Sequence, residues 1–478
     1  MTSSVPAVSS ERIPFYRDSR ILAVIAQVVF VIVFVAVVAF LYNNMTTRMA
    51  ASSGGAVSFN FNFLKQTSGF AIAEGPAFSP EESYGRAFTI GILNTLRIAL
   101  IGIVLATILG IITGIARLSN NWLLRNIAGA YVELIRSTPL LVQLFFLYFA
   151  VILKLPDLAN KISIPGVGIL SNRGMALSWF YVTEAGQSWF YWVLAGLVVA
   201  GIVIYLRQRS LAAQDRVGMS TPHGIIAFLI VVIVGLVITN MTGTLPSNIA
   251  YELRRGERGT LFVDANSNGK FDRGIDSPMR YVPVSLTAAD GTDLGTVVTD
   301  RSGEFRFYNL EQEGSGLTWE TPSALYLSKP ALQGFNILGG LSFSPEFAGL
   351  LLGLVLYTAA FIAEIVRAGI NSVSKGQTEA ARALGLKSGE TLRMIVLPQA
   401  MRVIIPPLTS QFLNLTKNSS LAIAIGYPDL FNVSLTVLNQ SGAAVQMFIL
   451  IMGTYLAISL LTSGFMNWYN SRVALVER

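Results

Sequence analysis

Long apolar segments separated by shorter polar ones dominate the hydrophobic pattern of the chain. Each segment is long enough for a helix to cross a bilayer core of about 30 Å, which takes about 20 residues. The pattern therefore predicts an all-α polytopic membrane protein with about eight transmembrane helices. They are expected at 21–42, about 88–115, about 127–153, about 189–206, about 224–241, about 347–366, after Pro406 and Pro407, and at about 443–465.

Basic residues near the span ends predict how these helices are oriented. Cytoplasmic loops carry an excess of Lys and Arg, and the periplasmic side does not. The relevant residues are Arg12, Arg17, Arg20, Arg117, Arg125, Arg207, Arg209, Arg216, Arg472 and Arg478. Their positions predict that both termini are cytoplasmic, with tails at 1–20 and 466–478. The segments 43–87 and 154–188 are then expected outside, and the alternation at 59–65 predicts an extended piece at the membrane surface.

Composition excludes several classes of protein. With 53% hydrophobic and only 13% charged residues, the 478-residue chain is not expected to be soluble. The net charge of +7 does not indicate nucleic-acid binding, because the basic residues cluster at span ends. The chain has no cysteine, so disulfides and thiolate metal sites are excluded. His223, beside Pro222 at the foot of a span, is expected to be interfacial rather than a ligand or a base.

The segment 254–318 has a different character from the rest of the chain. Short alternating strands and Gly- and Asp-rich turns predict a small inserted β-sandwich on the periplasmic side. Within it, oxygen side chains recur at alternate positions with Gly269 at the sixth place, a spacing at which a tight loop can wrap calcium. The candidate ligands are Asp264, Asn266, Asn268, Asp272 and Asp276. The segment resembles the calcium-binding B-type repeats of bacterial surface proteins; the alternative is an Asn/Gly-rich turn without metal.

A polar, charge-mixed stretch between two apolar segments predicts a short cytoplasmic helix. Ser374 followed by Gln377 has capping-box spacing, and Gly385 is a suitable left-handed stop. The stretch then carries Glu379, Ala380, Ala381, Gly385, Leu397 and Pro398 in register. At this spacing it resembles the EAA loop of ABC importer permeases, which implies that the helix couples the chain to an ATP-hydrolysing subunit. The alternative is an ordinary amphipathic loop.

Polar residues inside the spans mark candidate pathway positions. Ser410, Asn414 and Lys417 recur at helical spacing in the seventh span, followed by Asn418. They are expected either to line the translocation pathway, with Lys417 attracting a substrate carboxylate, or to make interhelical hydrogen bonds with Lys417 paired or snorkelling.

Glu133 and Arg136 in the third span are three residues apart. We expect an intrahelical ion pair at the cytoplasmic end. The alternative is that Pro139 breaks the helix and that the pair shapes a gate.

Several stretches resemble one family more specifically. RSTPLLVQLFF, GQTEAARALGL, LPQAMRVIIPPLTSQFLNLTKNSSLAIAIGYPDL and MNWYN are similar to ABC importer permeases of the polar amino-acid (histidine/glutamine/arginine/opine) branch, in particular the general L-amino-acid subgroup. The resemblance implies a type I importer core. Its parts are core helices 1–2 at 88–153 and core helices 3–5 at 347–465 with the EAA loop at 367–403. Outside this core, the resemblance implies an extra anchor helix at 21–42 and an inserted transmembrane hairpin at 189–241.

The same resemblance implies partners. They are a homologous second permease, an ABC ATPase dimer that binds ATP and Mg²⁺, a periplasmic amino-acid-binding protein, and an amino-acid substrate in the bacterial inner membrane. The permease itself is expected to hold no cofactor apart from possible calcium in the β insert. No Walker A sequence occurs in the chain, so it is not expected to be an enzyme itself. The alternatives are an ion-coupled secondary transporter and a membrane-anchored envelope interaction protein.

Overall fold

The computed structural model describes residues 19–52, 60–76, 78–213, 220–254, 258–272, 275–300, 302–307, 314–333 and 336–473. Most of the expected tail 1–20 and the end of the tail 466–478 lie outside these residues. Within them, five helices are long and apolar enough to cross a membrane, or up to seven if each of two bent helix pairs counts as one span. The five are α2 (Tyr84–Ala116), α5 (Trp189–Ala213), α6 (Thr221–Thr242), α7 (Pro345–Asn371) and α12 (Ala444–Val473).

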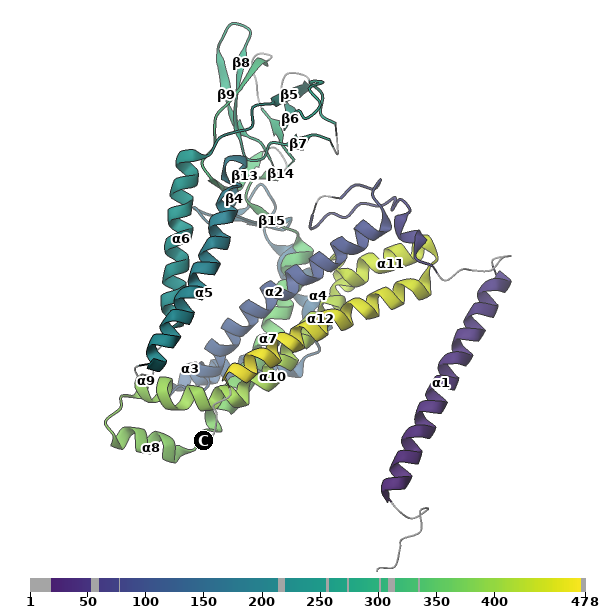
Figure 1. Cartoon of the computed structure of the whole chain (residues 1–478), viewed down its shortest axis with the longest axis vertical. Helices are drawn as coiled ribbons and strands as arrows, with labels where there is room; N and C mark the ends of the chain where they lie inside the picture. The colour runs from purple at the N-terminus through teal and green to yellow at the C-terminus, as the bar shows by residue number, and fades with distance from the viewer. Residues whose placement is uncertain are drawn as a thin grey trace, which may run out of the picture.

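The first helix stands apart from the bundle. Helix α1 (Ser19–Ser52) lies away from the other helices in Figure 1. Its side chains from Val24 to Val37 are all exposed, although nearly all are Val, Ile, Ala or Phe. A helix that is apolar on all sides requires an apolar surrounding, and the described part of the chain provides none for α1.

Helices α2 and α7 form the centre of the bundle. Their shared core contains Ile98 and Ala106 from α2, and Leu350 and Ile362 from α7. Small residues allow the two backbones to approach closely, as they do in membrane helix pairs. A Cβ added at Gly110 would lie 2.6 Å from Ile362 Cβ, which is far too close for a stable contact.

The third predicted span is not a single helix. Helix α3 (Trp122–Ser137) meets α4 (Leu140–Phe145) at a bend of 108°, so the span expected at about 127–153 is built from two helices. Thr138 is extended, with φ −107° and ψ 134°. The residue before a proline is driven out of the helical region, so Pro139 accounts for the break. The chain continues through the helical turns Phe146–Val151 and Ile152–Lys154.

The C-terminal half of the bundle begins earlier than expected. After α8 (Lys375–Ala383), α9 (Ser388–Thr391) and the turn η5 (Leu392–Val396), helix α10 spans Leu397–Asn418 with Pro406 and Pro407 inside it. The prediction that the span starts after Pro407 is therefore wrong.

Beyond α10 lies a helix that the hydrophobic pattern did not predict. The turn η6 (Ser419–Ile425) ends at Gly426, where φ is +81°, and leads to α11 (Leu430–Ser441) at a bend of 53°. Asp429 caps α11 by accepting a hydrogen bond from Asn432 N.

Antiparallel strands cover one end of the molecule (Figure 1). Two small sheets, β10-β6-β5 with β7 and β11-β8-β9, share one hydrophobic core that includes Leu261, Val284 and Phe305. They extend slightly beyond 254–318. The strands are β5 (Ile249–Arg254), β6 (Arg258–Val263), β7 (Ser277–Pro278), β8 (Pro283–Ala288), β9 (Asp293–Val298), β10 (Glu304–Arg306) and β11 (Gly314–Trp319).

Further strands lie between these sheets and the helices. The loop expected at 154–188 contributes four of them, of which β3 and β4 pair with strands that precede α7: the sheet order is β1-β2-β3-β15, and β12 pairs β4. They are β1 (Ile162–Ile164), β2 (Gly168–Ser171), β3 (Gly174–Leu177), β4 (Trp179–Val182), β12 (Leu325–Ser328), β13 (Ala331–Gln333), β14 (Asn336–Leu338) and β15 (Leu341–Phe343). At 60–65 the extended piece is not found, because Asn62–Lys65 is a short 3₁₀ helix.

Candidate functional site

The polar loop after α7 contains the predicted short helix, and its end is well defined. Helix α8 stops at Ala383, and Gly385 has φ +78°. Gly385 N donates to Arg382 O at 2.9 Å and Leu386 N donates to Ala381 O at 3.1 Å, which is the Schellman pattern. The start differs from the prediction: Ser374 makes no side-chain capping bond, and Gln377 N donates to its backbone oxygen instead.

The predicted coupling residues form an exposed surface on this loop. Glu379 and Ala380 are exposed, whereas Ala381 is only 3% exposed and packs α8 onto the rest of the loop. Next to Gly385, Leu384 is 83% exposed. A large apolar side chain at that exposure, beside small residues and a carboxylate, is suited to contact with another protein.

The position of this loop matches a role at one membrane face. Figure 1 places α8 and α9 at the end of the molecule opposite the β-sheets. Leu397 and Pro398 open α10 directly after the turn η5, whose helical hydrogen bonding continues into α10 because Leu397 N donates to Leu392 O. The loop is therefore joined directly to a helix of the bundle.

Helix α10 carries the predicted polar stripe on an exposed face. Ser410, Asn414 and Lys417 are all exposed and Asn418 is half-buried, while Leu415 and Thr416 on the other side are buried. Within the described part of the chain, the side chains of Ser410, Asn414 and Lys417 make no hydrogen bond or ion pair. Interhelical pairing inside this chain, the alternative considered above, is therefore not observed.

The expected pair between Glu133 and Arg136 is not formed. Glu133 is exposed, and Arg136 Nη1 instead lies 3.8 Å from Glu364 on α7, with its guanidinium 5.3 Å from the centroid of the Phe361 ring. The prediction of an intrahelical pair is therefore wrong. Helix α3 packs against α7, so the partner comes from a neighbouring helix.

Glu364 is the centre of a larger ion cluster. It also pairs with Arg117 at the end of α2 and with Arg367 on its own helix. The side chain of Glu364 is 25% exposed, and that of Arg117 is 20% exposed. One carboxylate thus joins α2, α3 and α7 at the end of the bundle that carries α8.

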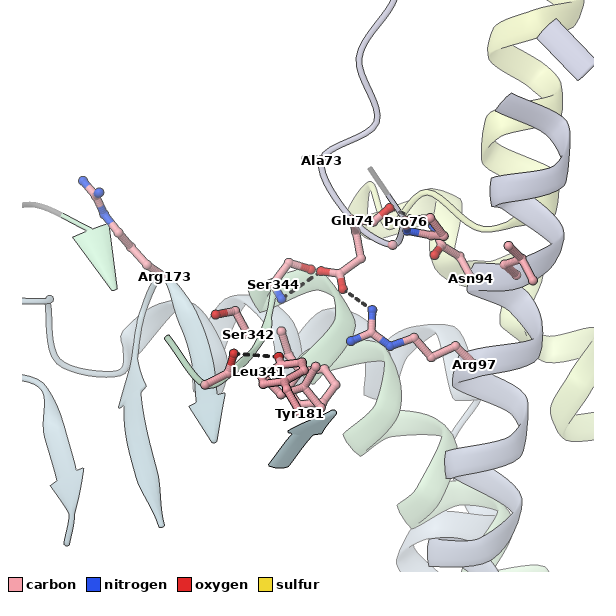
Figure 2. Close-up of a pocket in the computed structure, with 14 residues that line it drawn as sticks. Ala73, Glu74, Pro76, Asn94, Arg97, Arg173, Tyr181, Leu341, Ser342 and Ser344 are labelled. Atoms are coloured by element: carbon pink, nitrogen blue, oxygen red, sulfur yellow. Dashed lines mark hydrogen bonds and ion pairs between the residues drawn. The ribbon is translucent and has the colours of Figure 1, made fainter. Parts of the chain in front are cut away.

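A second polar site lies at the opposite end of the bundle. A cavity of about 670 Å³ is lined by the segment 73–76, by α2, by the turn before β3, by β4 and by β15 up to the start of α7. Figure 2 shows Arg97 pointing from α2 toward Glu74, which it meets at 2.6 Å. The other oxygen of Glu74 accepts a hydrogen bond from Ser344 N at 3.0 Å. Glu74 therefore joins the outer segment to both central helices.

The five predicted calcium ligands are close together but are engaged with one another and with the backbone. Asp264 accepts bonds from Asn268 N and Gly269 N, and Asp276 accepts them from Ala265 N and Asp272 N. The amides of Asn266 and Asn268 donate to Asp272, which lowers the pKa of Asp272. No group of three acidic or histidine side chains in the described ranges is arranged to hold a metal ion. A cation would have to replace these bonds, and calcium binding stays a prediction.

The fold and these surfaces define a class of protein. Apolar helices packed into a bundle, a polar stripe on one of them and an exposed helical loop at one end are the features of a helical membrane permease. The chain belongs to the family of binding-protein-dependent transport system inner membrane components, whose family model matches residues 216–475.

Three curated relatives are similar over nearly their whole length. The chain is 36% identical to the putative amino-acid ABC transporter permease protein YhdX of Escherichia coli K12, over 97% of both chains. It is 36% identical to the general L-amino acid transport system permease protein AapQ of Rhizobium johnstonii, over 96% of this chain and 94% of the relative. It is 33% identical to the glutamate/glutamine/aspartate/asparagine transport system permease protein BztB of Rhodobacter capsulatus, over 96% of both.

Sequence reasoning missed the two charged clusters that the fold assembles. Arg97 lies in the interior of α2, and a charge inside an apolar span is a signal of a special site. Glu364 has the same character in α7. Glu74 gave no such signal, because it lies in an irregular segment whose position depends on the fold.

Proposed function

We propose that the chain is the membrane-spanning subunit of an ATP-driven, binding-protein-dependent ABC importer for L-amino acids. The observation that carries this proposal is the identity of 33–36% with amino-acid permeases over nearly the full chain. The exposed helix α8, ended by the Schellman turn at Gly385, supports the same function. The chain itself is not an enzyme, and ATP with Mg²⁺ would be bound and hydrolysed by a separate subunit.

The topology that fits this function has eight crossings in the bacterial inner membrane. It counts α1, the five long helices and the two bent pairs once each. Both termini would be cytoplasmic. The β-sandwich expected at 254–318 would be periplasmic, and the opposite positions of α8 and the β-sheets in Figure 1 support this orientation.

Coupling to the ATPase dimer would use the surface around α8. Glu379 and Ala380 are exposed for contact, Ala381 anchors the helix, and Gly385 fixes its end. Leu397 and Pro398 connect the loop to α10, so a displacement of α8 moves the helix that carries the polar stripe. A homologous second permease would complete the pathway, and a periplasmic binding protein would deliver the amino acid to it.

The stripe on α10 would line this pathway. Polar side chains without partners are costly in a membrane unless they face a cavity or another subunit. Ser410, Asn414 and Lys417 are exposed on one helix face and Asn418 is half-buried, so we assign this face to the pathway between the two permeases. Lys417 would attract the substrate carboxylate. Arg136 and Glu133 would flank the cytoplasmic end of this pathway and act as a gate.

The proposal is tested by purifying the chain in mild detergent from cells that express its neighbours. An ATPase and a second permease should co-purify, and proteoliposomes of that assembly should import a labelled amino acid only with ATP and the binding protein. Uptake by the purified chain alone, driven by a proton gradient, would instead establish a secondary transporter. Assembly without transport of any amino acid in a full panel would refute the assigned substrate class.

A further inference from the structure

We propose that the cavity at the outer end of α2 is a binding site for the carboxylate of a free amino acid, with Arg97 as its main contact. The inference rests on the proposed function, and it adds a site near the periplasmic entrance, separate from the stripe on α10. Figure 2 shows the residues that line the cavity, among them Arg97, Glu74, Asn94 and Ser344. Its volume of about 670 Å³ lies within the range of small-molecule sites, roughly 300–1,000 Å³.

Arg97 is held in one orientation but uses only part of its hydrogen-bonding capacity. Its Nη1 contacts Glu74 at 2.6 Å, and its guanidinium carbon lies 4.9 Å and 4.8 Å from the ring centroids of Phe343 and Phe347. Among the described residues, Nε and Nη2 donate to no acceptor. The side chain is 25% exposed. A guanidinium with two free donors on a planar fork is suited to a carboxylate, which it can bind in a bidentate manner.

Glu74 cannot move easily to take up those free donors. The residue is 8% exposed, and its carboxylate is already divided between Arg97 and Ser344 N. Its backbone oxygen also accepts a hydrogen bond from Asn94 Nδ2 at 3.1 Å. Glu74 therefore acts as a positioning residue that fixes the guanidinium plane. The ligand would approach the other side of the guanidinium, which faces the cavity.

The rest of the lining suits an amino acid bound beside Arg97. Arg173 also lines the cavity, and in Figure 2 it lies apart from the Glu74–Arg97 pair. Apolar walls from Leu93 and Leu341 leave room for a side chain beside the carboxylate contact.

The absence of cysteine from the sequence permits a direct test. Ser342 is exposed and lines the cavity, so Ser342→Cys introduces a single thiol there. Ser163→Cys, on the exposed strand β1 and outside the cavity, is the matched control. Both variants are assembled with the ATPase and second permease, without binding protein, and their reaction with a maleimide is timed while amino acids are added.

We expect L-amino acids to slow labelling of Ser342→Cys, by about fivefold when the concentration is about four times Kd, and to leave Ser163→Cys unchanged. The decarboxylated amines of the same amino acids should not protect. Adding Arg97→Met should remove the protection. Arg97→Lys, which keeps the charge but loses the fork, should weaken it. Arg86→Met, on the exposed start of α2, should preserve it.

Equal protection by an amino acid and its amine, or no protection by any amino acid, would overturn the inference. The comparison on the unaltered Arg97 background does not depend on whether the Arg97 variants assemble. ATP-driven import is measured in the same preparations with binding protein added. Import without protection of Ser342→Cys refutes the outer site alone, whereas absence of import for every amino acid refutes the proposed function.

Discussion

Replacement of Gly385 tests the coupling role of α8 most directly. Its φ of +78° is in the left-handed region, which costs an L-residue other than glycine roughly 1–2 kcal/mol. A Cβ at this position would meet no atom within 4 Å, so there is no steric clash to add to that cost. The change therefore acts on the end of α8 and leaves the bundle packing unaltered. A cost of about 1–2 kcal/mol corresponds to a factor of roughly 5–30 in an equilibrium constant.

We expect Gly385→Val to insert and to assemble, but to lower ATP-driven uptake by up to about 30-fold. The reason is that a smaller fraction of molecules would present α8 with its Schellman end formed. Gly385→Asn should lose less activity, because asparagine adopts the left-handed conformation more readily. The assay is uptake of labelled amino acid into proteoliposomes, with co-purification of the ATPase measured on the same samples.

Gly376 provides a matched control on the same helix. It also has open space around a Cβ, but its φ is not positive. Gly376→Ala should stabilise α8 by about 0.5–1 kcal/mol and preserve uptake, while Gly385→Ala should lower it. If Gly385→Val imports at the wild-type rate, or if Gly376→Ala loses as much activity as Gly385→Ala, the assignment of α8 as the coupling helix is refuted.

Three further predictions concern other parts of the chain. Glu364→Gln should destabilise the bundle by about 1–2 kcal/mol in thermal unfolding, because three arginines lose their shared carboxylate in a partly exposed setting. Glu133→Gln, at an exposed glutamate, is the control and should leave the unfolding temperature unchanged. Equal destabilisation by the two substitutions would contradict the ion cluster. Lys417→Met should raise the substrate concentration for half-maximal transport about tenfold, if the ammonium group contributes about 1.4 kcal/mol to substrate binding. Lys154→Met serves as the control. Unaltered transport kinetics in Lys417→Met would exclude the contact with the substrate carboxylate. The lowered pKa of Asp272 stabilises the loop at 264–276 above the unfolded pKa of about 3.9, and this contribution is lost as the pH falls through the folded pKa. Protection of the amides in this loop, measured as exchange relative to the intrinsic rate at each pH, should therefore fall below about pH 4 in the wild type, and less so in Asp272→Asn. A calcium titration of the same two proteins by calorimetry tests the metal site, and absence of heat at millimolar calcium refutes it.

The helices were predictable where a single physical signal determined them. The apolar runs of α2, α5, α6, α7 and α12 exceed the bilayer thickness, and hydrophobicity alone identifies such segments. The end of α8 was predictable for a similar reason, because Gly385 is the residue type that a left-handed turn requires.

Elements with competing signals were not predictable. Helix α10 contains Pro406 and Pro407, which the sequence argument used as a boundary, yet the helix begins at Leu397. Helix α11 is too short to be recognised as a span, and it follows α10 after a bend at Gly426. Proline tolerance and bends depend on the neighbouring helices, which replace the lost backbone bonds.

Charge pairing shows most clearly what the sequence could not provide. The amino-acid pattern alone establishes a multi-span membrane protein with a short polar helix at one face, because hydrophobic length and turn chemistry are local properties. The partners of Arg136 and Arg97 depend on which helices meet. The packing of α3 on α7 brings Arg136 to Glu364, and the irregular outer segment brings Glu74 to Arg97. These residues are far apart in the sequence, so only the packing of the bundle brings them into contact.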